Sequence, residues 1–221
     1  HDCPGCSFTV VDADFSGATN LTTLSSQALF GCADLTGVLD LSNTQISTIG
    51  QMGLSGCTNL TGVILPDTLK EIGNSAFLND TSLRFVTTKD QYDSSDPDFV
   101  DFSLPDGLVS IGARAFAVAF ADMALTVVIP QSVTTIGSEA FYAQWNTSTL
   151  DYLPVRTIIV KGTNVDGFDA KAFKFYDSGL GNYPPRVTVM PNKETYDAFM
   201  KKAGGFSQDK DAITYPVTVS F

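Results

Sequence analysis

Residues 65–77 read LPDTLKEIGNSAF, and nearly the same pattern returns twice further along the chain. Residues 104–116 read LPDGLVSIGARAF, and residues 129–141 read IPQSVTTIGSEAF. The recurring marks are an apolar residue before proline, an Ile-Gly pair and an Ala-Phe pair. Self-similarity of this kind is typical of repeat proteins, in which each repeat completes the hydrophobic core of its neighbour. The pattern therefore predicts a stack of similar coils.

The period can be measured from the apolar residue five positions before each phenylalanine or its equivalent. These anchors are Leu24, Ile49, Ile72, Ile111, Ile136 and Phe168, with spacings of 25, 23, 39, 25 and 32 residues. A coil of about 23 residues fits this series, with one insertion at about residues 89–103 and another at about 146–153. We expect about six coils in a single domain of residues 1–221, with caps at 1–23 and 192–221 around repeats at 24–191.

Within one coil, the apolar positions suit neither a single helix nor a single hairpin. The segment Leu60–Leu65 has strand character, Pro66 ends it, and Gly73 is the expected bend. The ring of Phe77 is expected to point inward. In the C-terminal cap, Asn192 is expected to cap a helix through Lys202. Its apolar face would comprise Tyr196, Phe199 and Met200, and a final strand would span Ile213–Phe221.

The repeat resembles the BspA-like (Treponema pallidum type) leucine-rich repeats of bacterial and protozoan surface proteins. The residues that carry the resemblance are Leu60, Val63, Leu65-Pro66, Ile72-Gly73 and Ala76-Phe77, and it extends over about Leu24 to Pro191. It implies a strand-dominated α/β, right-handed leucine-rich-repeat solenoid with a C-terminal helix-strand cap. It also implies a cell-surface role in adhesion or in binding host components.

The amino-acid composition limits the possible binding partners and the possible cellular location of the protein. The net charge is -11, with 24 acidic residues against 13 basic ones, so nucleic acid is an unsuitable partner. No run approaches the roughly 18 apolar residues of a membrane-spanning helix, so we expect no membrane insertion. The N-terminus has no charged and then apolar leader. We expect a mature, extracellular or cell-surface chain that is a monomer.

Side chains suited to catalysis are few. The only histidine is His1, so a nucleophile, histidine and acid triad is excluded, and we expect neither an enzyme nor a cofactor. Cys3 and Cys6 are a lone Cys-x-x-Cys that suits a local disulfide or two thiols better than zinc. Cys32 and Cys57 share one column with Asp80, as stacked thiols or a disulfide. The acidic insertion lacks the glycine of a calcium loop and is interpreted as a solvated loop; its acids are Asp90, Asp93, Asp96, Asp98 and Asp101.

A candidate ligand-binding strip follows from counting back from the proline of each coil. The positions two before it, expected to point outward, are Ile64, Thr87, Val128, Ile159 and Val189. The positions five before it are Thr61, Arg84, Leu125, Arg156 and Arg186. Exposed apolar residues flanked by arginine are typical of interfaces. The alternative is that β-branched residues simply favour strands and each arginine neutralises a nearby aspartate.

These observations favour a non-catalytic, cell-surface or secreted binding module for a protein or glycan ligand. The first alternative is a passive spacer or assembly module of a larger surface protein. A polysaccharide hydrolase is the second, and it would require two carboxylates that face each other in a cleft.

Overall fold

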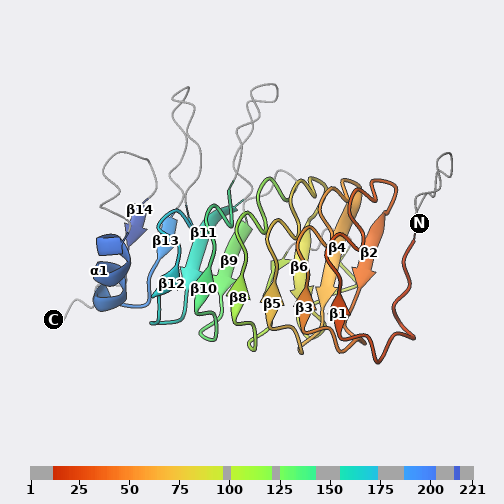
Figure 1. The fold of residues 1–221 in the computed structure, drawn as a ribbon, viewed down its shortest axis with the longest axis horizontal. Helices are drawn as coiled ribbons and strands as arrows, with labels where there is room; N and C mark the ends of the chain where they lie inside the picture. The colour runs from red at the N-terminus through yellow and green to blue at the C-terminus, as the bar shows by residue number, and fades with distance from the viewer. Residues whose placement is uncertain are drawn as a thin grey trace, which may run out of the picture.

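The computed structural model describes residues 12–96, 101–120, 125–142, 155–173, 187–202 and 212–214. Their strands lie side by side along the long axis of the molecule, and a helix lies at the C-terminal end (Figure 1). This arrangement confirms the predicted strand-dominated solenoid.

One side of the stack consists of the longer strands, which pair in parallel. The first sheet has the order β2 (Gly37–Asp40), β4 (Leu60–Leu65), β6 (Phe85–Thr88) and β7 (Asp101–Phe102). The second has the order β14 (Ala212–Thr214), β13 (Val187–Val189), β11 (Val155–Val160) and β9 (Leu125–Ile129). A parallel bridge between Ser103 and Val128 links the two sheets. The predicted strand Leu60–Leu65 is confirmed.

Short strands of two residues form the neighbouring side. They are β1 (Thr23–Leu24), β3 (Thr48–Ile49), β5 (Glu71–Ile72), β8 (Ser110–Ile111), β10 (Thr135–Ile136) and β12 (Gly167–Phe168). They form one six-stranded parallel sheet in this order. The register places all six predicted anchors in one row, and every anchor is buried. The predicted repeat frame is confirmed.

Phenylalanine rings from successive coils stack through the core. The Phe77 and Phe116 centroids lie 4.9 Å apart with planes inclined by 8°, and Phe116 and Phe141 lie 5.5 Å apart at 7°. Phe102 meets Phe116 edge-on at 5.0 Å. Near-parallel stacks and edge contacts at these distances add to the free energy gained by burial alone. The phenylalanine ring of each Ala-Phe pair therefore makes the central contact between neighbouring coils.

The bend expected at Gly73 lies two residues later. Ser75, Arg114 and Glu139 have φ values of 56°, 55° and 57°, so these three coils turn at a non-glycine residue in the left-handed region. Gly73 is required for a different reason, because a Cβ there would lie 2.7 Å from the backbone carbon of Gly50. The Ile-Gly mark therefore reflects close approach of neighbouring coils.

β6 has no counterpart among the short strands. The chain passes from β4 to β5 and from β7 to β8, but from β6 it enters the insertion and returns to a long strand, β7. As a result β5 pairs directly with β8, whereas β6 separates β4 from β7. The predicted insertion at 89–103 is thus too long, because residues 101–103 pair within the long-strand side. The insertion predicted at 146–153 lies outside the described residues.

The C-terminal cap begins as predicted. Helix α1 (Lys193–Lys202) is capped by Asn192, whose Oδ1 accepts a hydrogen bond from the Thr195 backbone N–H at 2.9 Å. Phe199 is fully buried, and its ring centroid lies 5.4 Å from that of Phe173 in the last described coil. The helix therefore closes the core. Of the predicted final strand, the part beyond Thr214 lies outside the described residues.

Replacing Phe116 by alanine is expected to lower the free energy of unfolding by about 3–5 kcal/mol, because it removes the middle ring of the stack and leaves a cavity. Val109→Ala, at a side chain that is 43% exposed, is the matched control and should change it by less than about 0.5 kcal/mol. Urea denaturation followed by circular dichroism measures both. Equal effects of the two substitutions would contradict the assigned role of the ring stack.

Candidate binding face and groove

The outward row predicted from the sequence exists as a row of register. Ile64 pairs with Thr87 in the first long sheet, and Val128, Ile159 and Val189 pair in succession in the second. Ser103 continues the row between the two sheets through its bridge to Val128. The inward neighbours on either side of this row, such as Val63 and Val127, are completely buried.

Exposure was predicted wrongly for the first half of this row, because Ile64 is only 1% exposed and Thr87 is completely buried. A side chain from the start of the insertion reaches across this part of the sheet. Lys89 Nζ lies 3.1 Å from Asp40 Oδ2 on β2, and β4 lies between β2 and β6. The long aliphatic part of the lysine therefore crosses β4, and such side chains readily cover apolar surface while the charge stays solvated.

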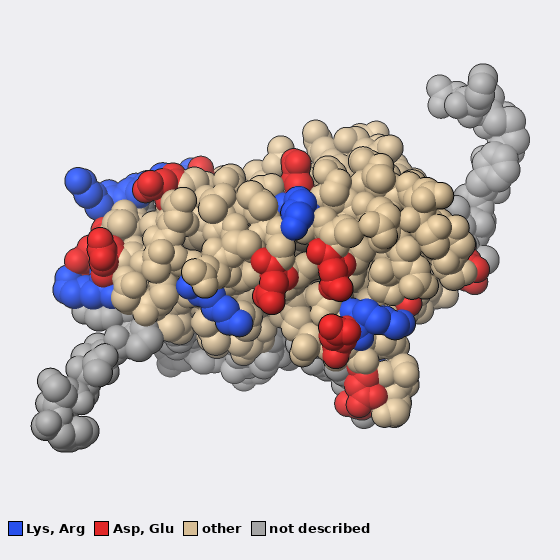
Figure 2. All heavy atoms as spheres, turned by 90° about the horizontal axis from the view of Figure 1, so that it is seen from below, with Lys and Arg blue, Asp and Glu red and all other residues tan. Residues whose placement is uncertain are grey.

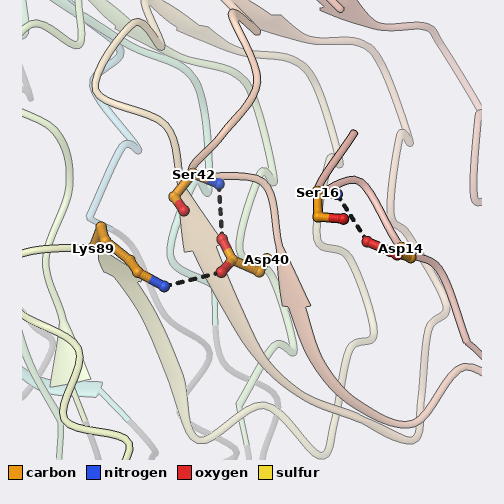
Figure 3. A network of polar contacts seen from close by, with 5 residues as sticks. All are labelled: Asp14, Ser16, Asp40, Ser42 and Lys89. Atoms are coloured by element: carbon orange, nitrogen blue, oxygen red, sulfur yellow. Dashed lines mark hydrogen bonds and ion pairs between the residues drawn. The ribbon is translucent and has the colours of Figure 1, made fainter. Parts of the chain in front are cut away.

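Asp40 is the acidic partner of Lys89 in this ion pair (Figure 3). Its Oδ1 accepts the Ser42 backbone N–H at 2.9 Å, and its Oδ2 is paired with Lys89. Burial pushes the pKa of Asp40 upward, but the hydrogen bonds with Ser42 and the Lys89 ammonium outweigh it and hold the pKa below its usual value. Asp40 therefore stays charged.

The N-terminal end of β4 is covered by an aromatic ring. Gly62 pairs with Phe85, and a Cβ on Gly62 would collide with the Phe85 ring, so the ring lies flat against the glycine backbone. Tyr92, in the insertion, packs on Phe85 with a centroid distance of 5.1 Å. The Phe85 ring therefore covers the outer face of β4 at Gly62.

The second half of the row is more open. Val128, Ile159 and Val189 are all half-buried. Of the predicted arginines, Arg84 is half-buried, and Arg156 lies at a β-bulge where the register of β11 shifts against β9. Arg186 lies outside the described residues, as does the side chain of Arg156. The binding role of the strip remains a prediction.

A groove opens where the long strands end, with a cavity volume of about 550 Å³. Val128 lines it and belongs to the predicted row. The acidic side chains Asp67, Asp90 and Asp106 also line it, and Lys161 is its basic residue. On the face drawn in Figure 2, acidic side chains gather near the middle with basic ones among and beside them.

The groove follows from the missing short strand after β6. The turns after β4 and β7 meet directly, as the hydrogen bond from the Val109 N–H to the Lys70 carbonyl shows at 2.8 Å. In the described part of the chain, the next strand after β6 is the long strand β7 and not a short one, and Thr88 at the end of β6 lines the groove. This groove was not predicted from the sequence. Two sequence features could have indicated it: the Pro-Asp pairs in two copies of the repeat, and the spacing of 39 residues between the anchors Ile72 and Ile111.

The cysteine column is confirmed as a structural feature. Asp80 Oδ1 accepts the Cys57 backbone N–H at 2.9 Å, and both Cys32 and Cys57 are free thiols. Burial is the main cause that raises the pKa of Cys57 to about 12, so this thiol is unreactive at neutral pH. Cys3 and Cys6 lie outside the described residues.

Asp80 is a buried carboxyl group. Burial raises its pKa to about 8, although backbone hydrogen bonds from Cys57 and Gly56 oppose the shift. Its Oδ2 is buried and has no hydrogen-bond partner among the described residues. The group is therefore largely protonated at neutral pH.

Neither a metal centre nor a membrane span is found in the described part of the chain. No group of three or more potential ligands from His, Cys, Asp and Glu could hold a metal ion there, the described part of the acidic loop included. Within that loop, Asp93 accepts hydrogen bonds from Ser95. No described helix has the length and apolar character needed to cross a membrane.

Stacked parallel coils with one row of anchors define the class of a leucine-rich-repeat solenoid. The model of the BspA type leucine rich repeat region matches residues 6–98 and 94–175 with six copies. The chain therefore belongs to the BspA-type leucine-rich-repeat family.

Solved structures of similar proteins include a leucine-rich repeat protein of T. pallidum, at 26% identity over 63% of this chain and 52% of that one, with a TM-score of 0.44. Another, from Bacteroides ovatus, has 18% identity over 88% of this chain and 55% of that one, also at 0.44. The pneumococcal vaccine antigen PcpA has 14% identity over 90% and 66%, at 0.30. The chain thus spans about half of the first two proteins. No curated protein matches it.

Gly62→Ala is expected to destabilise the fold by about 1–3 kcal/mol, because its methyl group would displace the Phe85 ring. Combining it with Phe85→Leu should cost less than the sum of the single changes, as measured in a double-mutant cycle by urea denaturation. Gly17→Ala is the control, since nothing lies within 4 Å of its Cβ. Simple additivity would show that the ring does not cover the strand.

Asp80→Asn should change how stability depends on pH. The folded pKa of about 8 lies above the ordinary value of 3.8, so the contribution of Asp80 is fully present below pH 3.8 and is lost as pH rises through 8. Asparagine keeps the shape without the ionisation. Relative to the parent chain, the variant should therefore gain a few kcal/mol between pH 5 and pH 9.

Thermal and urea unfolding at both pH values measure this difference, with the exposed Asp34→Asn as the matched control. A constant difference between Asp80→Asn and the parent across this range would mean that Asp80 is ionised in the fold throughout.

Proposed function

We propose that this chain is a non-catalytic binding module of a cell-surface or secreted protein, and that it binds a protein or glycan ligand. The observation that carries the proposal is the groove of about 550 Å³ at the ends of the long strands. This volume lies in the range of ligand sites, which is about 300–1,000 Å³. Membership of the BspA-type family supports the surface location.

The groove adjoins the open half of the outer row. Val128 belongs to both, so a ligand seated in the groove can extend over Ile159 and Val189 on neighbouring strands. Half-buried β-branched side chains offer apolar contact, and the acidic rim offers polar contact. An apolar centre beside a polar rim is the usual anatomy of an interface.

A passive spacer is the second candidate, and one observation favours it. The outward row is interrupted, because Ile64 and Thr87 in its first half are buried. A spacer needs no continuous open surface, whereas an adhesin that uses the whole sheet does. The two candidates differ in whether the second half of the row binds anything.

The polysaccharide hydrolase is the least supported alternative. The groove contains three carboxylates, but Asp67, Asp90 and Asp106 are all exposed. A glycosidase requires a general acid whose environment keeps it protonated, which is typically achieved by burial.

Saturable binding is expected when the purified chain is screened against matrix proteins, mucin, peptidoglycan and glycan panels. The Val128→Ser, Ile159→Ser variant should weaken that binding at least about tenfold, because it removes the apolar part of the surface without changing its charge. The Val109→Ser variant, on an exposed side chain away from this row, is the control. No binding by the parent chain to any component would favour the spacer.

A further inference from the structure

We propose that Cys32 and Cys57 form a disulfide bond in an oxidising environment. The bond joins the segment between β1 and β2 to the segment between β3 and β4, which belongs to the next coil. The structure shows the reduced form, in which both thiols are free. The proposal does not rest on the proposed function, because the bond involves no ligand.

The two cysteines lie opposite each other in neighbouring coils. The segment after β1 runs alongside the segment after β3 and pairs with it through a ladder of backbone hydrogen bonds. The bonds run from N–H to carbonyl oxygen: Gln27 to Gln51 at 2.9 Å, Leu29 to Gly53 at 2.8 Å and Gly31 to Ser55 at 2.8 Å. In such a parallel ladder, each N–H bonds the carbonyl of the residue before its partner. Gly31 is therefore opposite Gly56, and Cys32 is opposite Cys57.

Two further contacts agree with this register. A Cβ on Gly56 would lie 3.5 Å from the Gly31 Cα, so the backbones touch directly before the cysteines. The spacing of 25 residues between Cys32 and Cys57 equals the spacing of the anchors Leu24 and Ile49. Neighbouring chains in a ladder lie about 4.8 Å apart, and a disulfide requires Cα atoms roughly 4.4–6.8 Å apart. The fold thus places the pair at disulfide distance.

The Cys57 thiol points toward the coil that contains Cys32. Its Sγ lies 3.2 Å from the Leu29 carbonyl oxygen, and the Cys32 N–H donates to the same oxygen at 3.2 Å. Burial is the largest cause of the raised pKa of Cys57, and the charges of Asp80 and Cys32 add to it. A contribution from Cys32 requires that the two sulfur atoms lie close together.

The two thiols differ in how easily solvent reaches them. Cys57 is completely buried, whereas Cys32 is half-buried. On the far side, Asp80 Oδ1 accepts the Cys57 N–H at 2.9 Å and holds that backbone in place. The column continues with a carboxyl group rather than a third thiol, so exchange ends at this pair. Cys32 is therefore the thiol that meets an oxidant first.

The reaction requires a small disulfide as oxidant, such as oxidised glutathione. The Cys32 thiolate attacks one of its sulfur atoms, and one glutathione thiolate leaves and takes up a proton. Cys57 then loses its proton and attacks the Cys32 sulfur, which expels the second glutathione. Two protein thiols are thus oxidised, and one small disulfide is reduced to two thiols.

The coil that begins at β1 gains stability from such a bond. It lies at the N-terminal end of the described stack (Figure 1). Phe30 is 52% exposed and Val38 is 40% exposed, so this coil is less covered than the core coils. The terminal coils of a solenoid are generally the ones that separate first. A bond between residues 25 positions apart restricts the unfolded chain and opposes this separation.

Incubation of the native chain with oxidised and reduced glutathione at about pH 8.5 tests the proposal. Alkylation, cleavage before aspartate and mass spectrometry then locate the bond. This cleavage separates the cysteines: Cys3 and Cys6 fall in residues 2–11, Cys32 in residues 14–33 and Cys57 in residues 40–66. Residues 14–33 should be found linked to residues 40–66, and the link should disappear on reduction.

The oxidised chain should melt about 5–10 °C above the reduced chain. The Cys32→Ser variant should show neither the link nor this shift. The matched control, Cys3→Ser with Cys6→Ser, should retain both. Incubation of the urea-unfolded chain with the same reagents shows which pairings form without the fold.

Glutathione attached to Cys32 without the link would overturn the proposal, because Cys57 would then lie out of reach. A link that forms in urea but not in the native chain would overturn it as well, since the fold would not bring the pair together. A linked chain that melts no higher than the reduced chain would contradict the stabilising role. Each of these outcomes leaves the ligand screen, and with it the proposed function, unaffected.

Discussion

The structure depends on one constraint, that the side chains of each coil must match those of the next coil at the same height. The near-parallel stack of Phe77, Phe116 and Phe141 meets this constraint in the core, and the glycine that follows each of the four isoleucine anchors meets it at the backbone. A ring gains most from a neighbouring ring in a matching position, so the sequence must repeat the same residue types in every coil. The strands then pair in parallel because the coils already lie in register.

A local departure from the repeat is consequently possible only where the core contact is preserved. β6 is such a departure, since it adds a long strand without a short one. Phe77 and Phe116 still stack directly across this point, although 39 residues separate them. The mismatch between the numbers of long and short strands therefore affects only the surface, where the ends of the long strands separate and form the groove. The core is regular, and the surface carries the irregularity.

This division explains what the sequence could and could not predict. The six anchors, the strand Leu60–Leu65 and the Asn192 cap follow from residue types that serve the regular core, and all were predicted correctly. The burial of Ile64 was missed because the cover on the outer face of a strand depends on contacts between segments far apart in the sequence, which leave no periodic signal. The groove was missed for the same reason. Asp67 and Asp106 are recognisable as turn residues, but their meeting depends on pairing between β5 and β8 across the added strand.

Asp80 shows how the added strand is held in place. It lies just before β6 in the column that contains cysteine in the two preceding coils. Its carboxyl oxygen accepts the Cys57 N–H from the preceding coil, and its carbonyl accepts the Phe120 N–H at 3.1 Å from the coil beyond. A thiol is a weak acceptor and would serve the first of these bonds poorly, whereas a carboxyl group serves it well. The cost of burying that carboxyl is limited because it retains its proton. The segment that leads into the irregular strand is thus held by one residue to the coils on both sides.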